Sequence, residues 1–180
     1  AKREVVMANM ALLDELAHWT SDGPAILTGY IEPNYQGPGN DFFNAAALLD
    51  GGVIRDRVFK SLLPSYDVFD EDRYFEHAQS RRLIEFGGAK LGVTICEDIW
   101  SSPDHWNKVR YPVDPCAELS ALGAEILINI SASPFTLGKA AVRRDLVTET
   151  ARKWGLHMVY VNQVGTFGKW IIAVLKEEHR

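Results

Sequence analysis

The sequence predicts an α/β protein in which a mixed sheet is layered with helices. Three observations support this: glycine turns typical of hairpins lie in the first half, strands alternate with helices in the second, and the composition is that of a globular domain. The chain has 180 residues, a formal net charge of -5 and 47% hydrophobic residues. This length suits one domain with a sizeable core, so we expect residues 1–180 to form a single domain.

The first half of the chain predicts one helix followed by antiparallel strands. Apolar residues recur at helical spacing over residues 4–19, and residues 25–30 form a short apolar run typical of a buried strand. A loop rich in Gly, Pro and Asn follows at 32–40. The buried helix face is expected to consist of Val6, Met10, Leu13 and Ala17. Hairpins are predicted around Asp50-Gly51-Gly52, between strands 42–49 and 53–59, and around Gly87-Gly88, with 91–96 as the return strand.

The second half predicts strands that alternate with helices. Asp114 suits a helix N-cap, Pro115 suits the first helical position, and Gly123 is a plausible end of that helix. Residues 139–154 predict a second helix that Gly155 caps. Its apolar face is expected to contain Val147, Ala151 and Trp154, and the flanking strands are expected at 125–131 and 156–163. The apolar run 170–175 fits a strand or a helix.

Composition argues against several classes of protein. The sequence has no run of about 18 apolar residues, so no transmembrane helix is expected. The pI near 5.5 argues against general nucleic-acid binding. The first residues lead into an amphipathic helix rather than a signal peptide. Two cysteines are too few for a disulfide scaffold, so we expect reduced thiols in a cytoplasmic protein.

Two cysteines and one lysine are the candidates for chemistry. Cys96 follows an apolar strand, where α/β folds place ligands, but a buried structural thiol is the competing interpretation. Cys116 lies in a predicted first helical turn that can favour a thiolate, although its surroundings favour a structural role. Lys60 also follows a strand, where a lone lysine is usually solvated. The five histidines show no metal-ligand spacing, so no metal site is expected.

Four ordered segments resemble the nitrilase or carbon–nitrogen hydrolase superfamily. KSLLPSYDVFDEDRYF (60–75) resembles its lysine segment and LGVTICEDIW (91–100) resembles its nucleophile segment. EILINISASPFTLGK (125–139) and VYVNQVG (159–165) also match. Together with YPVDPCAEL (111–119), they resemble the branch formed by the glutamine-hydrolysing domains of glutamine-dependent NAD synthetases.

The resemblance implies an α-β-β-α sandwich and a Glu-Lys-Cys triad. It assigns Cys96 as the nucleophile that forms a thioester and Lys60 as the oxyanion stabiliser. The backbone N–H of Glu97 would be a second oxyanion donor, and Glu71 would orient Lys60. An amide is a poor electrophile, so its cleavage needs a strong nucleophile, a proton for the leaving amine and positive charge beside the oxyanion.

The resemblance also implies a glutamine pocket. Tyr66, Phe69, Glu97 and Ser133 match its lining positions, and Glu97 would pair with the α-ammonium of glutamine. Core packing is the competing interpretation for Tyr66 and Phe69. Asp98 and Trp100 match the motif but are expected to be structural.

The chain also departs from the family pattern. The triad glutamate, expected about seventy residues before the lysine, would lie upstream of residue 1, and neither Glu4 nor Glu15 matches its motif. Residues 166–180 differ from the usual continuation, and no Ser-Gly-Gly-rich ATP loop is present. We therefore expect a portion of the domain that is incomplete at both ends and lacks the synthetase domain.

These features favour one function over two alternatives. The favoured function is glutamine hydrolysis that supplies ammonia to a synthetase domain of the same polypeptide, which converts nicotinic acid adenine dinucleotide to NAD. No cofactor is expected for the glutaminase step, while ATP and Mg belong to the synthetase step. A homo-oligomer is expected, without nucleic acid or membrane partners. The alternatives are a free-standing amidase or nitrilase and a non-catalytic scaffold.

Overall fold

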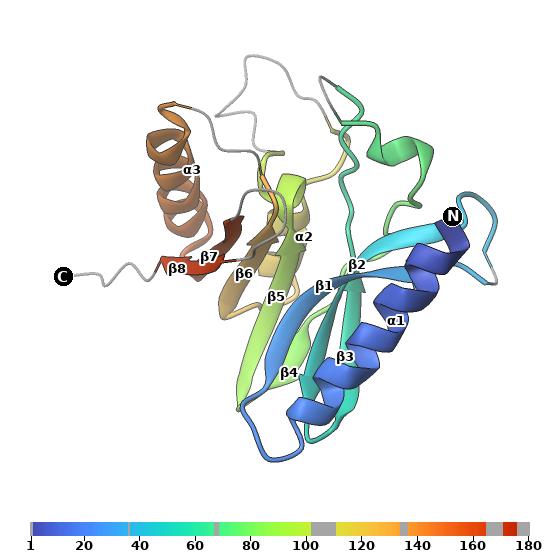
Figure 1. The fold of residues 1–180 in the computed structure, drawn as a ribbon. Helices are drawn as coiled ribbons and strands as arrows, with labels where there is room; N and C mark the ends of the chain where they lie inside the picture. Colours follow the sequence, from blue (N-terminus) through green and yellow to red (C-terminus); the bar gives the residue numbers. More distant parts are fainter. Residues whose placement is uncertain are drawn as a thin grey trace. The chain divides into compact units, whose positions relative to one another are not determined.

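The computed structural model shows two compact units, Ala1–Ser80 and Arg81–Arg180, each built around its own sheet (Figure 1). The expectation of a single domain stays a prediction. The α/β class is confirmed, with one antiparallel and one mixed sheet. The structure describes residues 2–35, 37–66, 69–101, 111–133, 137–164 and 171–175.

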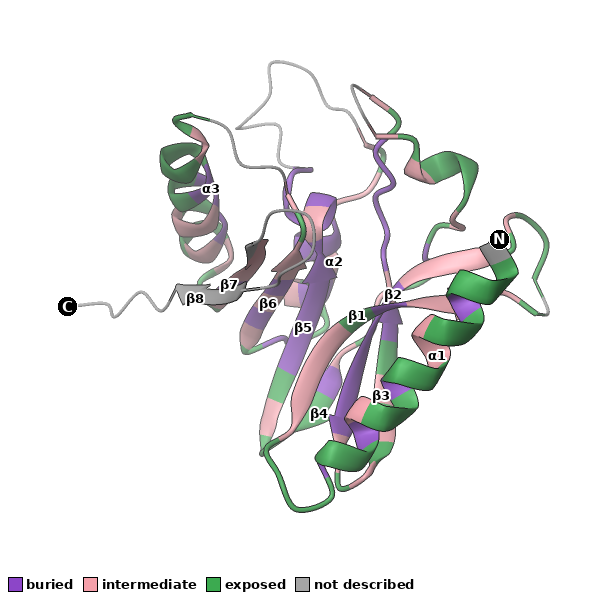
Figure 2. Ribbon diagram, viewed as in Figure 1, coloured by how far each residue is buried: buried purple, intermediate pink, exposed green. Residues whose placement is uncertain are grey.

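The first unit is a three-stranded antiparallel sheet with one helix packed on it. The strand order is β1-β2-β3, and the helix is α1 (Lys2–Trp19). The strands are β1 (Ile26–Pro33), β2 (Phe42–Asp50) and β3 (Val53–Phe59). In Figure 2 the central strand β2 is buried over much of its length, whereas much of α1 is exposed.

The predicted apolar face of α1 does form the core of this unit. Val6, Leu13 and Ala17 are buried, and Met10 packs against the cluster that contains Leu13 and Ala17. This cluster also includes Tyr30 of β1 and three residues of β2, namely Ala45, Ala47 and Leu49. The predicted helix 4–19 is therefore confirmed, with a start two residues earlier at Lys2.

The hairpin predicted at Asp50-Gly51-Gly52 is confirmed. Gly51 and Gly52 have φ of 59° and 83°, and Asp50 pairs with Val53, as in a two-residue turn with two positive φ values. The predicted start of the loop at residue 32 is wrong, because β1 continues to Pro33, which pairs with Phe42. A proline is tolerated there because β1 is an edge strand. The backbone N–H that proline lacks is not needed by another strand at this edge.

The second unit is a five-stranded sheet in the order β4-β5-β6-β7-β8. Its three inner strands β5 (Ala89–Ile95), β6 (Ile126–Ser131) and β7 (His157–Val164) are parallel, as the strand–helix alternation predicted. The antiparallel edges are β4 (Ile84–Phe86) and β8 (Ile171–Leu175). The apolar run 170–175 therefore forms a strand over 171–175, while Trp170 lies outside the described residues.

Two helices connect the parallel strands, α2 (Pro115–Ala121) and α3 (Lys139–Trp154). Asp114 caps α2 as predicted, since its carboxylate accepts the N–H groups of Cys116 and Ala117. Residue 123 has φ of 91° just beyond α2, and Gly155 ends α3 in the left-handed region. Both glycine stops are therefore confirmed.

Both helices pack through one core against β6 and β7. This core joins Cys116 and Leu119 of α2, Leu146 of α3, Leu127 of β6 and Tyr160 of β7. Val147 and Trp154 of the predicted α3 face pack against it. Gly92 of β5 permits the close approach, since a Cβ there would lie 2.8 Å from Leu127 Cδ2 and 3.3 Å from Leu119 Cβ.

The predicted end of the strand 91–96 is wrong by one residue. β5 ends at Ile95, and Cys96 begins the short 3₁₀ helix η2 (Cys96–Ile99). Cys96 has φ of 47°, which no extended strand can accommodate. The carboxyl ends of β5, β6 and β7 lie along one edge of the sheet, because the three strands are parallel neighbours.

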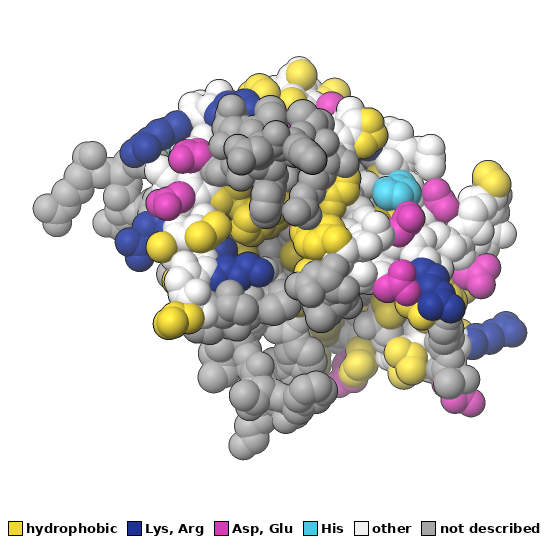
Figure 3. Space-filling model, turned by 90° about the horizontal axis from the view of Figure 1, so that it is seen from above, with side chains coloured by type: hydrophobic (Ala, Val, Ile, Leu, Met, Phe, Trp, Pro, Cys, Tyr) yellow, Lys and Arg dark blue, Asp and Glu magenta, His cyan; other side chains and the backbone are white. Residues whose placement is uncertain are grey.

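The surface carries charges of both signs. On the face in Figure 3, basic and acidic side chains are interspersed. In the part of the chain that the structure describes, no helix is long and apolar enough to cross a membrane. Nor do those residues include a cluster of three or more His, Cys, Asp or Glu side chains that could hold a metal ion.

The core of the first unit makes a testable prediction. Leu13→Ala should lower the free energy of unfolding by about 2–4 kcal/mol, because it leaves a cavity under α1. The neighbouring variant Leu12→Ala should change it by less than about 0.5 kcal/mol, because Leu12 is 58% exposed. Urea unfolding followed by circular dichroism measures both, and equal losses would contradict this assignment of the helix face.

Candidate active site

The predicted site residues lie on both units. We define the lysine half-site as Lys60, Tyr66, Phe69 and Glu71 of the first unit, and the cysteine half-site as Cys96, Glu97 and Ser133 of the second. Each half-site lies just beyond a strand end, which is where α/β folds commonly place reactive side chains.

Lys60 lies immediately after β3, where the chain leaves the sheet. Its N–H donates to Asn44 O at 2.8 Å and its carbonyl accepts the N–H of Ala78 at 2.9 Å. The preceding residue, Phe59, stacks on Phe43 with ring centroids 4.4 Å apart. These contacts fix the backbone on both sides, so the lysine side chain starts from a rigid position.

The lysine ammonium is buried against a carboxylate. The Lys60 side chain is only 1% exposed, and its Nζ lies 2.6 Å from Glu71 Oε2. The same oxygen accepts Asn44 Nδ2 at 3.2 Å. Glu71 begins the 3₁₀ turn η1 (Glu71–Arg73), and its N–H donates to Pro64 O. The structure thus brings Glu71 to Lys60, as the sequence predicted, and it removes the solvated alternative for Lys60.

Tyr66 and Phe69 form a half-buried aromatic pair in the same segment. Their rings meet edge to face with centroids 5.8 Å apart, and Phe69 N–H donates to Tyr66 O at 3.0 Å. Both rings keep part of their surface exposed. The pair therefore differs from fully buried core residues and retains surface that a ligand can contact.

Cys96 carries an uncommon backbone conformation. It is the one non-glycine residue with positive φ in the described ranges, and this left-handed conformation costs about 1–2 kcal/mol. The neighbouring carboxylate of Asp98 accepts Ile95 N–H at 2.9 Å, and Trp100 N–H donates to Glu97 O at 2.8 Å. The buried Asp98 therefore holds the turn in place, as its predicted structural role requires.

Glu97 and Ser133 complete the cysteine half-site. The Glu97 side chain is 5% exposed, and its Oε1 accepts the hydroxyl of Tyr111 at 2.9 Å. Both backbone groups of Ser133 are held, since its N–H donates to Asn162 Oδ1 at 3.0 Å and its carbonyl accepts Arg143 Nη2 at 2.7 Å. Ser133 thus sits on a fixed backbone segment just beyond β6.

Cys116, the rival nucleophile, is unsuited to that role. It is 2% exposed in the core, and its Sγ lies 4.0 Å from Asp98 O. Burial raises the pKa of the Cys116 thiol, and the nearby charges of Asp114 and Asp98 raise it further. A thiolate is therefore disfavoured there, and the structural interpretation holds.

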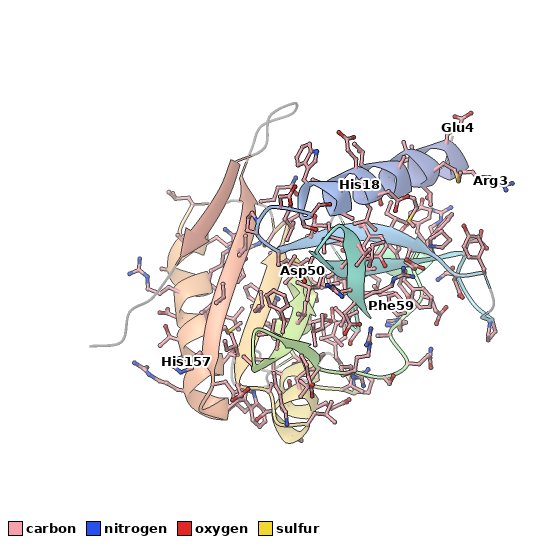
Figure 4. The ribbon with its side chains drawn as sticks, turned by 90° about the horizontal axis from the view of Figure 1, so that it is seen from below. Arg3, Glu4, His18, Asp50, Phe59 and His157 are labelled. Atoms are coloured by element: carbon pink, nitrogen blue, oxygen red, sulfur yellow. The ribbon has the colours of Figure 1, made fainter. Side chains whose placement is uncertain are left out.

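Several polar residues of the sites were missed from the sequence. Asn44 bonds to Glu71, while Arg143 and Asn162 hold the backbone of Ser133. Asn129 is fully buried beside Cys96. The available signal was a polar residue inside an otherwise apolar strand, as in ILINIS for Asn129. Glu4 lies exposed on α1 (Figure 4), in agreement with leaving it unassigned.

The chain is similar to known proteins over most of its length. No family model matches the sequence. A glutamine-dependent NAD(+) synthetase from Synechocystis sp. is 38% identical over 160 residues, which cover 85% of this chain and 29% of that protein. The corresponding enzyme from Thermotoga maritima is 37% identical over 159 residues, which cover 87% of this chain and 25% of that protein.

Solved structures agree with these matches. The glutamine-dependent NAD+ synthetase of Acinetobacter baumannii has a TM-score of 0.73 at 28% identity, over 92% of this chain and 29% of that chain. A nitrilase-superfamily amidase from Nesterenkonia AN1 has a TM-score of 0.70 at 20% identity, over 93% of this chain and 58% of that chain, which shows the fold alone.

The chain belongs to the nitrilase, or carbon–nitrogen hydrolase, superfamily and matches a portion of glutamine-dependent NAD synthetases. It spans 29% and 25% of the length of the two synthetases compared above.

The buried ion pair predicts a large effect on stability. Glu71→Ala should lower the free energy of unfolding by about 3 kcal/mol, because it leaves the Lys60 ammonium buried without its carboxylate. Asp70→Ala is the matched control and should cost less than about 1 kcal/mol, because Asp70 is 57% exposed in its pair with Arg73. Urea unfolding at pH 7 measures both, and a small effect of Glu71→Ala would mean that Lys60 is solvated.

A second ion pair predicts a pH dependence. Arg81 Nε and Nη2 lie 2.7 and 2.8 Å from the Glu118 carboxylate oxygens, and this hydrogen bonding lowers the pKa of Glu118 below its ordinary 4.5. A lowered folded pKa stabilises the protein above the unfolded pKa, and the contribution is lost as the pH falls through the folded pKa.

Glu118→Gln should therefore lower the free energy of unfolding at pH 7 by about 0.5–1 kcal/mol, a modest value because this carboxylate is 43% exposed. The difference from wild type should shrink as the pH falls below 4.5. Glu85→Gln, at an exposed position of β4, is the control and should change little. A pH-independent difference would show that the ion pair is not its cause.

Proposed function

We propose that this chain is the glutamine-hydrolysing portion of a glutamine-dependent NAD synthetase. The observation that carries the proposal is the pairing of the buried Lys60 ammonium with Glu71, in a chain that also presents Cys96 at a strained strand end. The matches to NAD synthetases favour glutamine over other amides as the substrate.

In this proposal Lys60 and Cys96 act on the same substrate, as in the Glu-Lys-Cys triad that the resemblance to the nitrilase superfamily implies. Lys60 and Cys96 each follow a strand end. A nearby ammonium favours the thiolate and stabilises negative charge on the substrate oxygen.

The proposed reaction has two covalent steps. The Cys96 thiolate attacks the side-chain amide carbon of glutamine, the C–N bond breaks, and ammonia leaves as the thioester forms. Water then attacks the thioester, which releases glutamate and restores the thiol. Lys60 and the Glu97 N–H stabilise the oxyanion, while Glu71 orients Lys60. We assign the proton-relaying glutamate to a residue outside 1–180, since no glutamate of this chain matches the family motif.

The substrate contacts follow from charge and shape. Glu97 is a buried carboxylate suited to the α-ammonium of glutamine. Tyr66 and Phe69 provide a partly exposed aromatic wall, and Ser133 provides polar groups on a fixed backbone. The hydrolytic step needs no cofactor. The released ammonia would serve a synthetase domain that uses ATP and Mg in a cytoplasmic homo-oligomer.

Two other functions compete with this proposal. A free-standing amidase of the same superfamily is one alternative, since the Nesterenkonia amidase has this fold. A non-catalytic scaffold is favoured by the lack of a matching triad glutamate in the sequence. Selectivity for glutamine over other amides would distinguish the proposed glutaminase from the free-standing amidase. An inert Cys96 thiol would support the non-catalytic scaffold.

Covalent labelling tests the proposed function. A diazoketone analogue of glutamine should add one equivalent to the purified chain, measured by intact-mass spectrometry. Cys96→Ala should abolish the labelling and Cys116→Ala should retain it, because the Cys116 thiol is buried. Excess L-glutamine should slow the reaction. L-Isoglutamine, which carries its amide on the α-carboxyl and not on the side chain, should not slow it.

Iodoacetamide provides the accessibility control for this experiment. If Cys96 reacts with iodoacetamide but shows no preference for the glutamine analogue, the chain lacks the proposed pocket. Equal protection by acetamide and by L-glutamine would instead favour the free-standing amidase.

A further inference from the structure

A fully buried asparagine lies in the strand next to Cys96. Asn129 is at the fourth position of the strand β6, has 0% exposure, and pairs in register with Thr94 of β5. Apolar residues flank it on both sides in the sequence ILINIS. A buried amide in such a strand is costly unless all its polar atoms find partners.

The amide of Asn129 joins two strands at the cysteine. Its Nδ2 donates to Thr94 Oγ1 at 3.0 Å and to the backbone carbonyl of Cys96 at 3.4 Å. Its Oδ1 accepts the hydroxyl of Ser131 at 2.7 Å. Thr94 Oγ1 donates onward to Ile128 O, so it is available as an acceptor for Asn129. The backbone carbonyl of Cys96 can only accept, so Nδ2 is the end of the amide that faces Cys96, with or without Thr94.

The backbone of Cys96 needs such a restraint. Its positive φ is strained, and strained residues persist only where the surroundings fix them from several directions. Asp98 holds the residue before Cys96 through Ile95 N–H. Asn129, in the neighbouring strand β6, holds Cys96 itself by donating to the Cys96 backbone carbonyl.

We propose that Asn129 is a positioning residue for the Cys96 thiol. By holding the Cys96 carbonyl, the Asn129 amide keeps the left-handed turn that aims Sγ at the substrate carbon. The inference rests on the proposed function of Cys96 as a nucleophile. Small misplacements of a reacting atom slow a reaction strongly, whereas substrate affinity depends on other groups.

The test compares two variants at Asn129 with a matched control. Asn129→Asp keeps the side-chain shape but replaces both N–H donors of the amide with an oxygen. Asn129→Ser is smaller and too short to reach the Cys96 carbonyl. Thr94→Val disturbs the same buried network with conserved volume, but it leaves the bond between Asn129 and Cys96 intact.

The first readout is the kinetics of labelling by the diazoketone analogue, resolved into KI and kinact. For both Asn129 variants kinact should fall at least about tenfold, with KI within about threefold of wild type. Thr94→Val should keep both constants within about threefold. An equally large fall in kinact in Thr94→Val would overturn the proposal, and so would an unchanged kinact in the Asn129 variants. A merely structural role would not lower kinact while leaving KI nearly unchanged.

The second readout does not depend on the proposed function. Hydrogen exchange, measured by mass spectrometry on the peptide 93–101, should speed up at least about tenfold in the Asn129 variants and not in Thr94→Val. Unchanged exchange in this peptide would overturn the positioning role. If the wild type shows no selective labelling while exchange changes as expected, the proposed function fails, but the hold of Asn129 on Cys96 stands.

Discussion

Burial of one lysine ammonium constrains the path of the chain after β3. Lys60 is almost inaccessible to solvent, so the fold must deliver a carboxylate to it. The strand β3 ends one residue earlier, and the chain then bends through Pro64 so that Glu71 returns to within 2.6 Å of Nζ. A buried ion pair is poor evidence for stability, since apolar replacements are often as stable. The proposed function would give this desolvated cation a chemical use.

The second unit carries a comparable cost at Cys96. The left-handed backbone of a non-glycine residue is unfavourable, and the buried groups of Asp98 and Asn129 are committed to holding it. The two costs complement each other chemically, because one unit supplies a fixed cation and the other a fixed thiol. Amide cleavage by a cysteine needs both, so the proposed function gives a single reason for two otherwise unfavourable features.

Local patterns in the sequence predicted most of the fold. The helix α3 has the predicted limits, and the hairpin glycines, the Asp114 cap and the parallel strands also agree with the structure. The predictions failed where pairing with another strand determines the end of an element, as in the extension of β1 to Pro33. They also failed where the backbone is strained, as at Cys96. Lys60 and Cys96 were candidates from their positions at strand ends, and their proposed roles come from the resemblance. Asn129 was missed because its importance comes from a contact 33 residues away in sequence.

The most direct test of the account asks whether Lys60 and Cys96 share one site. The rate of Cys96 alkylation by iodoacetamide would be measured against pH in a Cys116→Ala background. Lys60→Met/Glu71→Gln removes the ammonium without leaving an unpaired carboxylate, and Lys90→Met at an exposed position is the control. If the ammonium lies beside the thiol, its removal should disfavour the thiolate. The pH midpoint of Cys96 alkylation should then rise by at least about one pH unit in the double variant and stay unchanged in the control. An unchanged midpoint in the double variant would contradict the shared site.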